Sequence, residues 1–228
     1  MLCSRRRICE GRRNTVKKYV FFDFDGTLFD TAEGIVKSVQ YALKKLGIDA
    51  EPSELMCFAG PPLEDMFRQK YGMDEAAALK AVGYFRERYK PIGWKECRPF
   101  DGVAELLTKL RQAGITIAVA TSKPEYFTNA ILENAGLLTA VDFVGGSLFD
   151  GTRGKKHEVI AYVLKHFGIS PDEAVMVGDR MYDVDGAKKC GMDCIGVSYG
   201  YAEPGELMSH GALCVADTTQ ELYEILTK

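Results

Sequence analysis

Short apolar runs alternate with amphipathic helical patterns along most of this 228-residue chain. The runs are too continuous to be half-exposed strands, and their alternation with helices is typical of a mostly parallel sheet. The strands that this pattern predicts span residues 19–22, 115–120, 141–145, 174–177, 194–197 and 213–216. We therefore predict an α/β fold with helices on both faces of the sheet.

The helical patterns lie between these strands and also fill one long insertion. One apolar face runs from Val103 to Leu110 and stops at Gly114, and another runs from Val159 to Phe167. Between residues 31 and 98 we find helical patterns, including 63–71 and 75–89, and no persuasive strand. The expected organisation is a Rossmann-like core domain, residues 17–30 and 99–228, that carries an inserted all-helical cap domain, residues 31–98.

Composition and charge narrow the class of protein. The chain is 46% hydrophobic and 27% charged, as in soluble globular proteins, and no apolar run approaches the ~18 residues of a membrane span. Its seven cysteines are scattered, which favours a cytoplasmic location over a secreted or zinc-bound framework. Residues 1–18 contain five arginines and two lysines against one glutamate, a net charge of +6. Since the whole chain has a net charge of −3, the remaining residues carry a net charge of −9. An acidic body argues against nucleic acid as a partner.

Residues 1–16 are predicted to form a basic, disordered leader. They contain no apolar period that would place them in a core and no apolar stretch of the kind that secretory signals need. A solvated extension is favoured over an RNA-binding or transit tail. A further hypothesis is that translation starts at Val16, read from a GUG codon, because the first strand follows almost at once.

Two carboxylates directly follow the first predicted strand. Asp23 and Asp25 stand at the C-terminal end of that strand, where open α/β sheets bind their ligands, and residues two apart on an extended chain share a face. A turn at Asp25-Gly26 is an alternative reading for the second residue alone. Because an apolar strand has no structural use for Asp23 beside it, we interpret the pair as functional.

A second acidic cluster, with Asp179, Asp183 and Asp185, follows another predicted strand. If the two strands are neighbours, Asp23, Asp25, Asp179 and Asp183 converge on one crevice. At ~4 Å and an effective dielectric constant of ~20, each close pair of carboxylates repels by about 4 kcal/mol, so the cluster needs a cation. An all-oxygen donor set suits Mg²⁺. Helix capping would explain Asp183 or Asp185 alone.

Two further segments carry cations and hydroxyl groups. Lys155-Lys156 opens a predicted helix, whose N-terminal N–H groups attract anions, so lysines there indicate an anionic ligand. Solvated lysines are an equally good interpretation of this feature alone. Thr121-Ser122-Lys123 ends a predicted strand, where hydroxyl and free N–H groups can cradle a phosphate, or a hydroxyl can cap the helix that starts near Pro124.

In order and spacing, these segments resemble the haloacid dehalogenase superfamily across residues 17–228. The four matching motifs are Asp23-Phe24-Asp25-Gly26-Thr27, Thr121, Lys156, and Gly178-Asp179 with Asp183. The resemblance implies that Asp23 is a nucleophile that forms an aspartyl-phosphate, and that Asp25 is the general acid and base.

The same resemblance implies the roles of the other motif residues. Mg²⁺ would be held by Asp23, the Asp25 backbone and Asp179, with Asp183 bound either directly or through water. Thr121 and Lys156 would bind the phosphoryl oxygens. Lys155 is the rival for the second of these roles.

The resemblance also indicates the subgroup. A second aspartate at position 25 is typical of phosphatases and mutases, and not of dehalogenating members. Residues 58–63 resemble a cap segment of phosphoglycolate phosphatase-like and 5′-nucleotidase-like members, which implies that Gly60 faces the substrate; a simple helix-start loop is an equal alternative. Gly26, Thr27 and Ser122 are also expected to contact the substrate.

We therefore predict a cytoplasmic Mg²⁺-dependent phosphatase for small phosphate monoesters of the 5′-nucleotide or phosphoglycolate type. No nucleic-acid or membrane partner is expected, and the sequence leaves monomer and homodimer equally open. The alternatives are a phosphomutase of the same superfamily and a non-catalytic module that binds phosphate and Mg²⁺. A P-loop kinase would need a Gly-Lys-Ser/Thr ending, which residues 146–152 lack.

Overall fold

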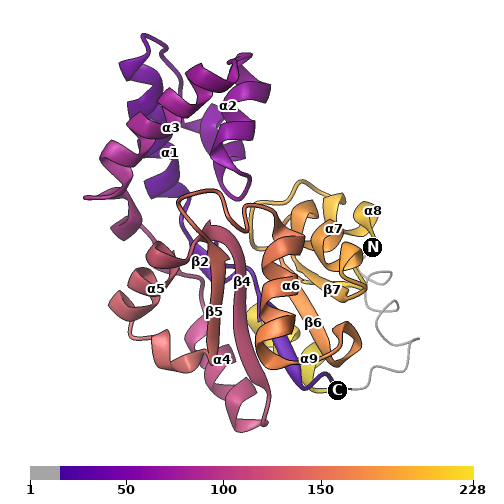
Figure 1. The fold of residues 1–228 in the computed structure, drawn as a ribbon. Coiled ribbons are helices and arrows are strands. Elements are labelled where there is room, and N and C mark those ends of the chain that lie inside the picture. Colours follow the sequence, from indigo (N-terminus) through magenta and orange to yellow (C-terminus); the bar gives the residue numbers. More distant parts are fainter. Residues whose placement is uncertain (1–15) are drawn as a thin grey trace.

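The computed structural model describes residues 16–228 (Figure 1). Residues 1–15 lie outside the described residues. They make up all of the predicted leader except Val16, and they are the segment that the hypothesis of a translation start at Val16 concerns. Within residues 16–228, no helix is both long and apolar enough to cross a bilayer.

The central sheet of the described chain has six parallel strands in the order β5-β4-β1-β6-β7-β8. Their bounds are β1 (Tyr19–Phe22), β4 (Thr116–Pro124), β5 (Phe143–Ser147), β6 (Ala174–Gly178), β7 (Asp193–Val197) and β8 (Val215–Ala216). Tyr19 pairs with both Thr116 and Ala174, so β1 lies between β4 and β6. The strand that precedes the first pair of carboxylates is therefore a neighbour of the strand that precedes the second acidic cluster.

Helices cover both faces of this sheet. One face packs against α4 (Val103–Gln112), α5 (Glu125–Asn134) and α9 (Thr219–Thr227), and the other against α6 (Lys156–Phe167), α7 (Met181–Lys189) and α8 (Glu206–His210). Short 3-10 helices, Leu138–Ala140 and Pro171–Glu173, precede β5 and β6. Side chains of β1 alternate between the two cores, with Val20 and Phe22 on one face and Phe21 on the other. The predicted α/β fold is confirmed.

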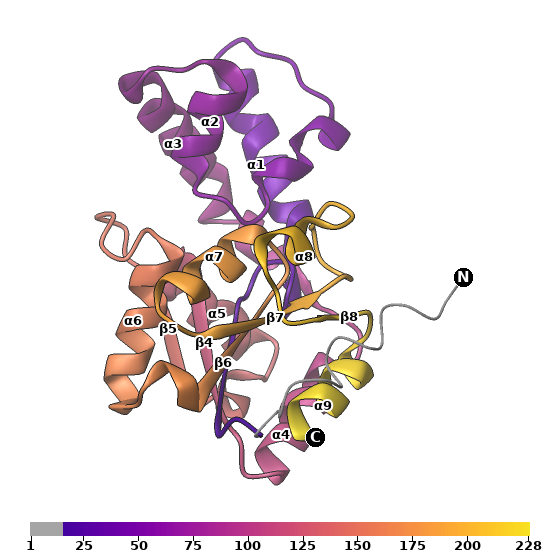
Figure 2. The same cartoon turned by 90° about the vertical axis from the view of Figure 1, so that its right-hand side faces the viewer.

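A separate group of helices stands off one end of the sheet (Figure 2). This helical insert contains α1 (Ala32–Lys45), α2 (Leu63–Tyr71) and α3 (Glu75–Tyr89), with 3-10 helices at Pro52–Phe58 and Gly93–Lys95. Its apolar faces form a core of their own, in which Leu43, Leu55 and Phe67 are fully buried. The bounds of α2 and α3 are those that the apolar pattern predicted.

Two very short strands join the helical insert to the rest of the chain. β2 (Phe29–Asp30) leads into the insert and β3 (Arg98–Pro99) leads out of it, and the two pair antiparallel. The sequence analysis did not predict them, because two residues are too few to show an alternating pattern.

Candidate active site

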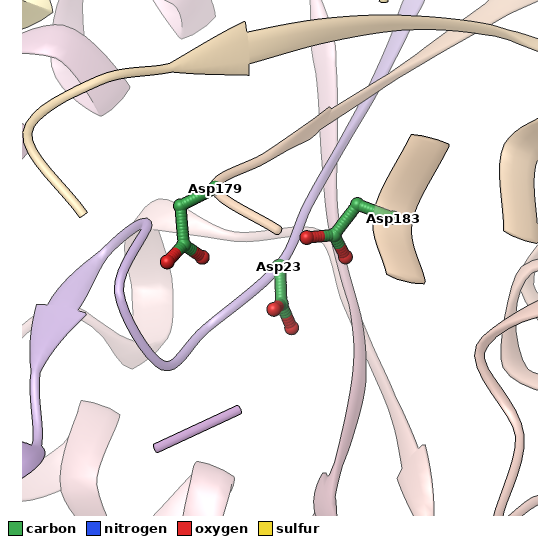
Figure 3. Close-up of side chains that lie close together, drawn as sticks. All are labelled: Asp23, Asp179 and Asp183. Carbon is green, nitrogen blue, oxygen red and sulfur yellow. The ribbon is translucent and has the colours of Figure 1, made fainter. Parts of the chain in front are cut away.

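Among the described residues, three buried aspartates meet where β1 and β6 end (Figure 3). Asp23 directly follows β1, Asp179 directly follows β6, and Asp183 lies in the first turn of α7. One carboxylate oxygen from each lies within 4.8 Å of the other two. The backbone N–H of Asp23 donates to Val177 O at 2.9 Å, which extends the β1–β6 pairing to the aspartate itself. The predicted convergence of these three carboxylates is therefore present.

Glycines allow the carboxylates to lie this close to the backbone. Gly26 has a φ of +82°, and a Cβ at this position would collide with the carboxylate of Asp179. A Cβ at Gly178 would collide with the side chain of Asp183. The structure thus gives Gly26, which we expected to contact the substrate, a steric function beside Asp179.

Hydrogen bonds fix two of the three carboxylates. Asp179 accepts from the Thr27 hydroxyl at 3.0 Å and from the backbone N–H of Tyr201 at 2.8 Å. Asp183 Oδ2 accepts from the backbone N–H of Arg180 at 3.0 Å. Thr27 is fully buried, and its hydroxyl orients Asp179. Tyr201 was missed by the sequence analysis, since its contribution here is a main-chain N–H that no residue type signals.

Lys156, the first residue of α6, places its ammonium group against the cluster. Its Nζ lies 2.6 Å from Asp23 Oδ1 and 2.8 Å from Asp183 Oδ1, and it donates to Ala120 O at 3.1 Å. Burial opposes the charge of Lys156, but the two carboxylates prevail and raise its pKa above the ordinary value. Lys155 lines the adjoining cleft, and its side chain makes no ion pair with the described residues. The structure thus brings Lys156, and not Lys155, to Asp23.

The cluster brings three carboxyl groups together against the single ammonium group of Lys156. Within residues 16–228, Asp23 Oδ1 and Asp183 Oδ1 are buried, and Lys156 is the one cation whose ion pairs reach them. Burial raises the pKa of Asp23 to about 6, and the charges of Asp183 and Asp25 act in the same direction, against Lys156. Burial also raises the pKa of Asp179 well above its ordinary value. Burying three carboxylates against a single ammonium group is costly, and their hard oxygen donors fit Mg²⁺.

The side chain of Asp25 makes contacts of its own, outside this cluster. Lys123 Nζ donates to Asp25 Oδ1 at 2.9 Å and to the Tyr89 hydroxyl at 2.7 Å. All three residues are buried, and Tyr89 belongs to α3 of the helical insert. Burial opposes the charge of Lys123, but Asp25 and Tyr89 together raise its pKa above the ordinary value. Lys123 stands beside Thr121 and Ser122 in the sequence, where nothing indicated that its side chain would reach Asp25.

A cleft of about 220 Å³ opens beside the cluster, between the core and the helical insert. Of the residues predicted for the site, it is lined by Asp23, Asp183, Lys156, Ser122 and Gly60. Those that the structure places outside its lining are Asp25, Gly26, Thr27, Thr121 and Asp179. The buried Thr121 hydroxyl accepts from the backbone N–H of Lys123 at 3.2 Å. The lining of the cleft therefore combines the carboxylate of Asp23, the ammonium group of Lys156 and a hydroxyl residue, Ser122.

Comparison with known proteins identifies the family that this fold and site define. Residues 20–197 match the model of the haloacid dehalogenase-like hydrolases. A 5′-nucleotidase of Pseudomonas aeruginosa is 46% identical over 193 residues, which cover 84% of this chain and 87% of that protein. The chain belongs to the haloacid dehalogenase-like hydrolase family, as its motifs predicted.

Two further relatives are similar to this protein over more than nine tenths of its chain. A crystal structure of a predicted phosphatase from Clostridium acetobutylicum superposes with a TM-score of 0.90 at 42% identity, covering 92% of this chain and 98% of that one. The tyrosine-protein kinase PtkA of Mycobacterium tuberculosis is 39% identical over 210 residues, which cover 91% of this chain and 72% of that protein. The predicted enzyme class, a phosphoric monoester hydrolase of this family, is confirmed.

Proposed function

We propose that the protein is a Mg²⁺-dependent phosphatase that hydrolyses small phosphate monoesters through an aspartyl-phosphate on Asp23. The observation that carries this proposal is the position of Asp23. Its carboxylate lines the cleft, lies 2.6 Å from the Lys156 ammonium, and belongs to a cluster of three buried carboxylates. A nucleophile at a cleft wall, beside fixed positive charge, is what covalent phosphoryl transfer requires.

In the first step, a carboxylate oxygen of Asp23 attacks the phosphorus atom, and the bond from phosphorus to the leaving oxygen breaks. Asp25 gives its proton to that oxygen, so the alcohol leaves neutral. Lys156 offsets charge on the phosphoryl oxygens, and the hydroxyl groups of Ser122, which lines the cleft, and of Thr121 are proposed to bind those oxygens. Mg²⁺, held by Asp23, Asp179, Asp183 and the Asp25 backbone carbonyl, would supply further positive charge there.

In the second step, water attacks the phosphorus atom of the aspartyl-phosphate. Asp25 now accepts a proton from that water, and the bond between phosphorus and Asp23 breaks, which releases phosphate and restores the carboxylate of Asp23 and the protonated form of Asp25. Splitting hydrolysis in this way lets one carboxyl group serve both leaving group and water.

The helical insert is proposed to act as the cap that selects the substrate, with residues 31–98 closing over a core of residues 17–30 and 99–228. Gly60, with a φ of +104°, and Asp65 bring this insert to the cleft, and Arg180 and Lys155 line it from the core. A cleft of about 220 Å³ is smaller than the ~300–1,000 Å³ of pockets for drug-sized ligands, so its size favours the smaller, phosphoglycolate-like ester. We propose a 5′-nucleotide or a phosphoglycolate-like substrate in the cytoplasm, and the similarity to a 5′-nucleotidase supports the first.

The test compares wild type with Asp23→Asn in Mg²⁺-dependent phosphate release from p-nitrophenyl phosphate, phosphoglycolate, nucleoside 5′-monophosphates and sugar phosphates. Asp193→Asn is the matched control, because Asp193 is exposed at the start of β7. We expect turnover by wild type and control and its loss in Asp23→Asn. No release from any substrate by folded wild type, or activity retained by Asp23→Asn, would refute the proposal.

A further inference from the structure

A buried chain of three side chains connects the loop after β1 with the helical insert. Lys123, near the end of β4, lies at its centre and donates to Asp25 Oδ1 and to the Tyr89 hydroxyl. The three residues are 7%, 8% and 4% exposed respectively. Withdrawing a lysine from water to this extent is costly, and here the ion pair with Asp25 and two hydrogen bonds offset that cost.

The surroundings hold the Lys123 ammonium in one place. Its backbone N–H donates to the Thr121 hydroxyl at 3.2 Å, at an irregularity in the pairing of β4 with β5. At the other end, the Tyr89 ring stacks on Phe85 with centroids 4.9 Å apart and meets Phe127 edge-on at 5.1 Å. Strand and insert thus fix this cation from both sides, and the cation in turn fixes Oδ1 of Asp25.

We propose that Lys123 is a positioning residue for Asp25, anchored by the Tyr89 hydroxyl. This inference rests on the proposed function, in which Asp25 exchanges a proton with the leaving oxygen and then with water. Lys123 occupies Oδ1 throughout and transfers nothing, which leaves Oδ2 to carry the proton. Without the ammonium, the carboxyl group is free to rotate away, and protonation of the leaving group is the step that suffers.

This mechanism predicts a dependence on the leaving group that a merely structural lysine would not produce. Phenyl phosphate and p-nitrophenyl phosphate have similar shapes, but the nitrophenolate leaves without help from an acid whereas the phenolate needs a proton. Loss of Lys123 should therefore lower kcat/KM more for phenyl phosphate than for p-nitrophenyl phosphate. A defect in folding or in cleft shape would lower both alike.

The experiment measures kcat/KM for p-nitrophenyl phosphate divided by kcat/KM for phenyl phosphate. This ratio is determined for wild type, Lys123→Met and Tyr89→Phe. Methionine keeps an unbranched chain of similar length without the charge, and phenylalanine removes only the hydroxyl. Lys165→Met is the matched control, because Lys165 is exposed on α6. We expect the ratio to rise about tenfold or more in Lys123→Met, by less in Tyr89→Phe, and to stay unchanged in the control.

Asp25→Asn supplies the reference, because it removes the proton that Lys123 is proposed to position. It should raise the ratio at least as far as Lys123→Met does, and adding Lys123→Met to it should raise the ratio no further. An equal loss on both substrates in Lys123→Met would overturn the inference. Should that variant fail to fold by circular dichroism, an unchanged ratio in Tyr89→Phe would overturn it instead.

The controls separate this inference from the proposed function. If wild type releases no phosphate, or Asp23→Asn stays active, the phosphatase proposal itself fails. If turnover depends on Asp23 but the ratio does not move in Lys123→Met, only the positioning role of Lys123 is refuted.

Discussion

The burial of Asp23 and Asp179, together with the repulsion between the carboxylates of their cluster, should make the stability of the metal-free protein depend on pH in an unusual direction. Burial raises the pKa of folded Asp23 from its ordinary 3.8 to about 6. Between these two values the folded protein retains a proton that the unfolded chain has lost. The free energy of unfolding therefore falls as pH rises from about 4 through about 6, whereas paired carboxylates give the opposite slope.

The size of this loss follows from the difference between the two pKa values. At about 1.36 kcal/mol per unit, the change from 3.8 to about 6 corresponds to roughly 3 kcal/mol for Asp23. Asp179, whose pKa is also raised by burial, acts in the same direction. For a chain of this size, roughly 3 kcal/mol lowers Tm by about 6–12 °C. A cation bound by the ionised carboxylates should return much of this stability near neutral pH and little below about pH 5.

The assay is thermal unfolding of chelator-treated protein at about pH 5 and about pH 7.5, with and without added Mg²⁺. We expect Mg²⁺ to raise Tm several degrees more at the higher pH. Asp179→Asn should stabilise the metal-free protein near neutral pH and abolish the response, and Asp193→Asn, at an exposed position, should behave like wild type. An equal response to Mg²⁺ at both values of pH, or a normal response in Asp179→Asn, would contradict the assignment of this cluster as a cation site.

Two further predictions follow from the contacts at the site. Lys156→Met should lower kcat/KM by roughly 10²–10³, because it removes a charge beside the nucleophile. Lys155→Met should lower kcat/KM far less. Steady-state kinetics would show the reverse order if Lys155 served the phosphoryl group. Gly26→Ala should abolish the Mg²⁺-dependent rise in Tm, because the new Cβ would displace Asp179. Gly47→Ala is the control: Gly47 has a φ of +75° and no atom within 4 Å of an added Cβ, so this change should cost only about 1–2 kcal/mol of backbone strain. An unchanged Mg²⁺ response in Gly26→Ala would show that the glycine does not shape the cluster.

The parts of the site that sequence could predict are those that depend on strand order. Asp23 and Asp179 each follow a buried apolar run, and the carboxyl ends of neighbouring parallel strands meet at one edge, so their convergence could be expected. The Lys123 contacts could not, because they join residues 98 and 34 positions apart through the packing of α3 against the core. Nor could the contact of Thr27 with Asp179, since a threonine in a phosphate-binding motif reads equally well as a ligand of the substrate.

The ends of the strands were predicted correctly where a nearby polar residue marks them, and not where pairing with a distant strand sets them. The first strand was predicted with its bounds because Asp23 interrupts its apolar run. β4 was expected to stop at Ala120, yet it extends to Pro124 because the chain stays extended beside β5, where Pro124 pairs with Ser147. Polar residues that continue a strand give no apolar pattern to follow.

The ladder of β2 and β3 makes the helical insert replaceable. Phe29 pairs with Pro99 and Asp30 with Arg98, so the chain leaves and re-enters the core about 5 Å apart, the ordinary spacing of paired strands. A two-residue hairpin could close that gap without moving β1 or shifting the register of the sheet. The whole insert could therefore be exchanged, as a single cassette, for one of another size and chemistry without disturbing the sheet. The exchange would also remove the Tyr89 hydroxyl that anchors Lys123, so a working replacement would have to bring a new partner for that ammonium group.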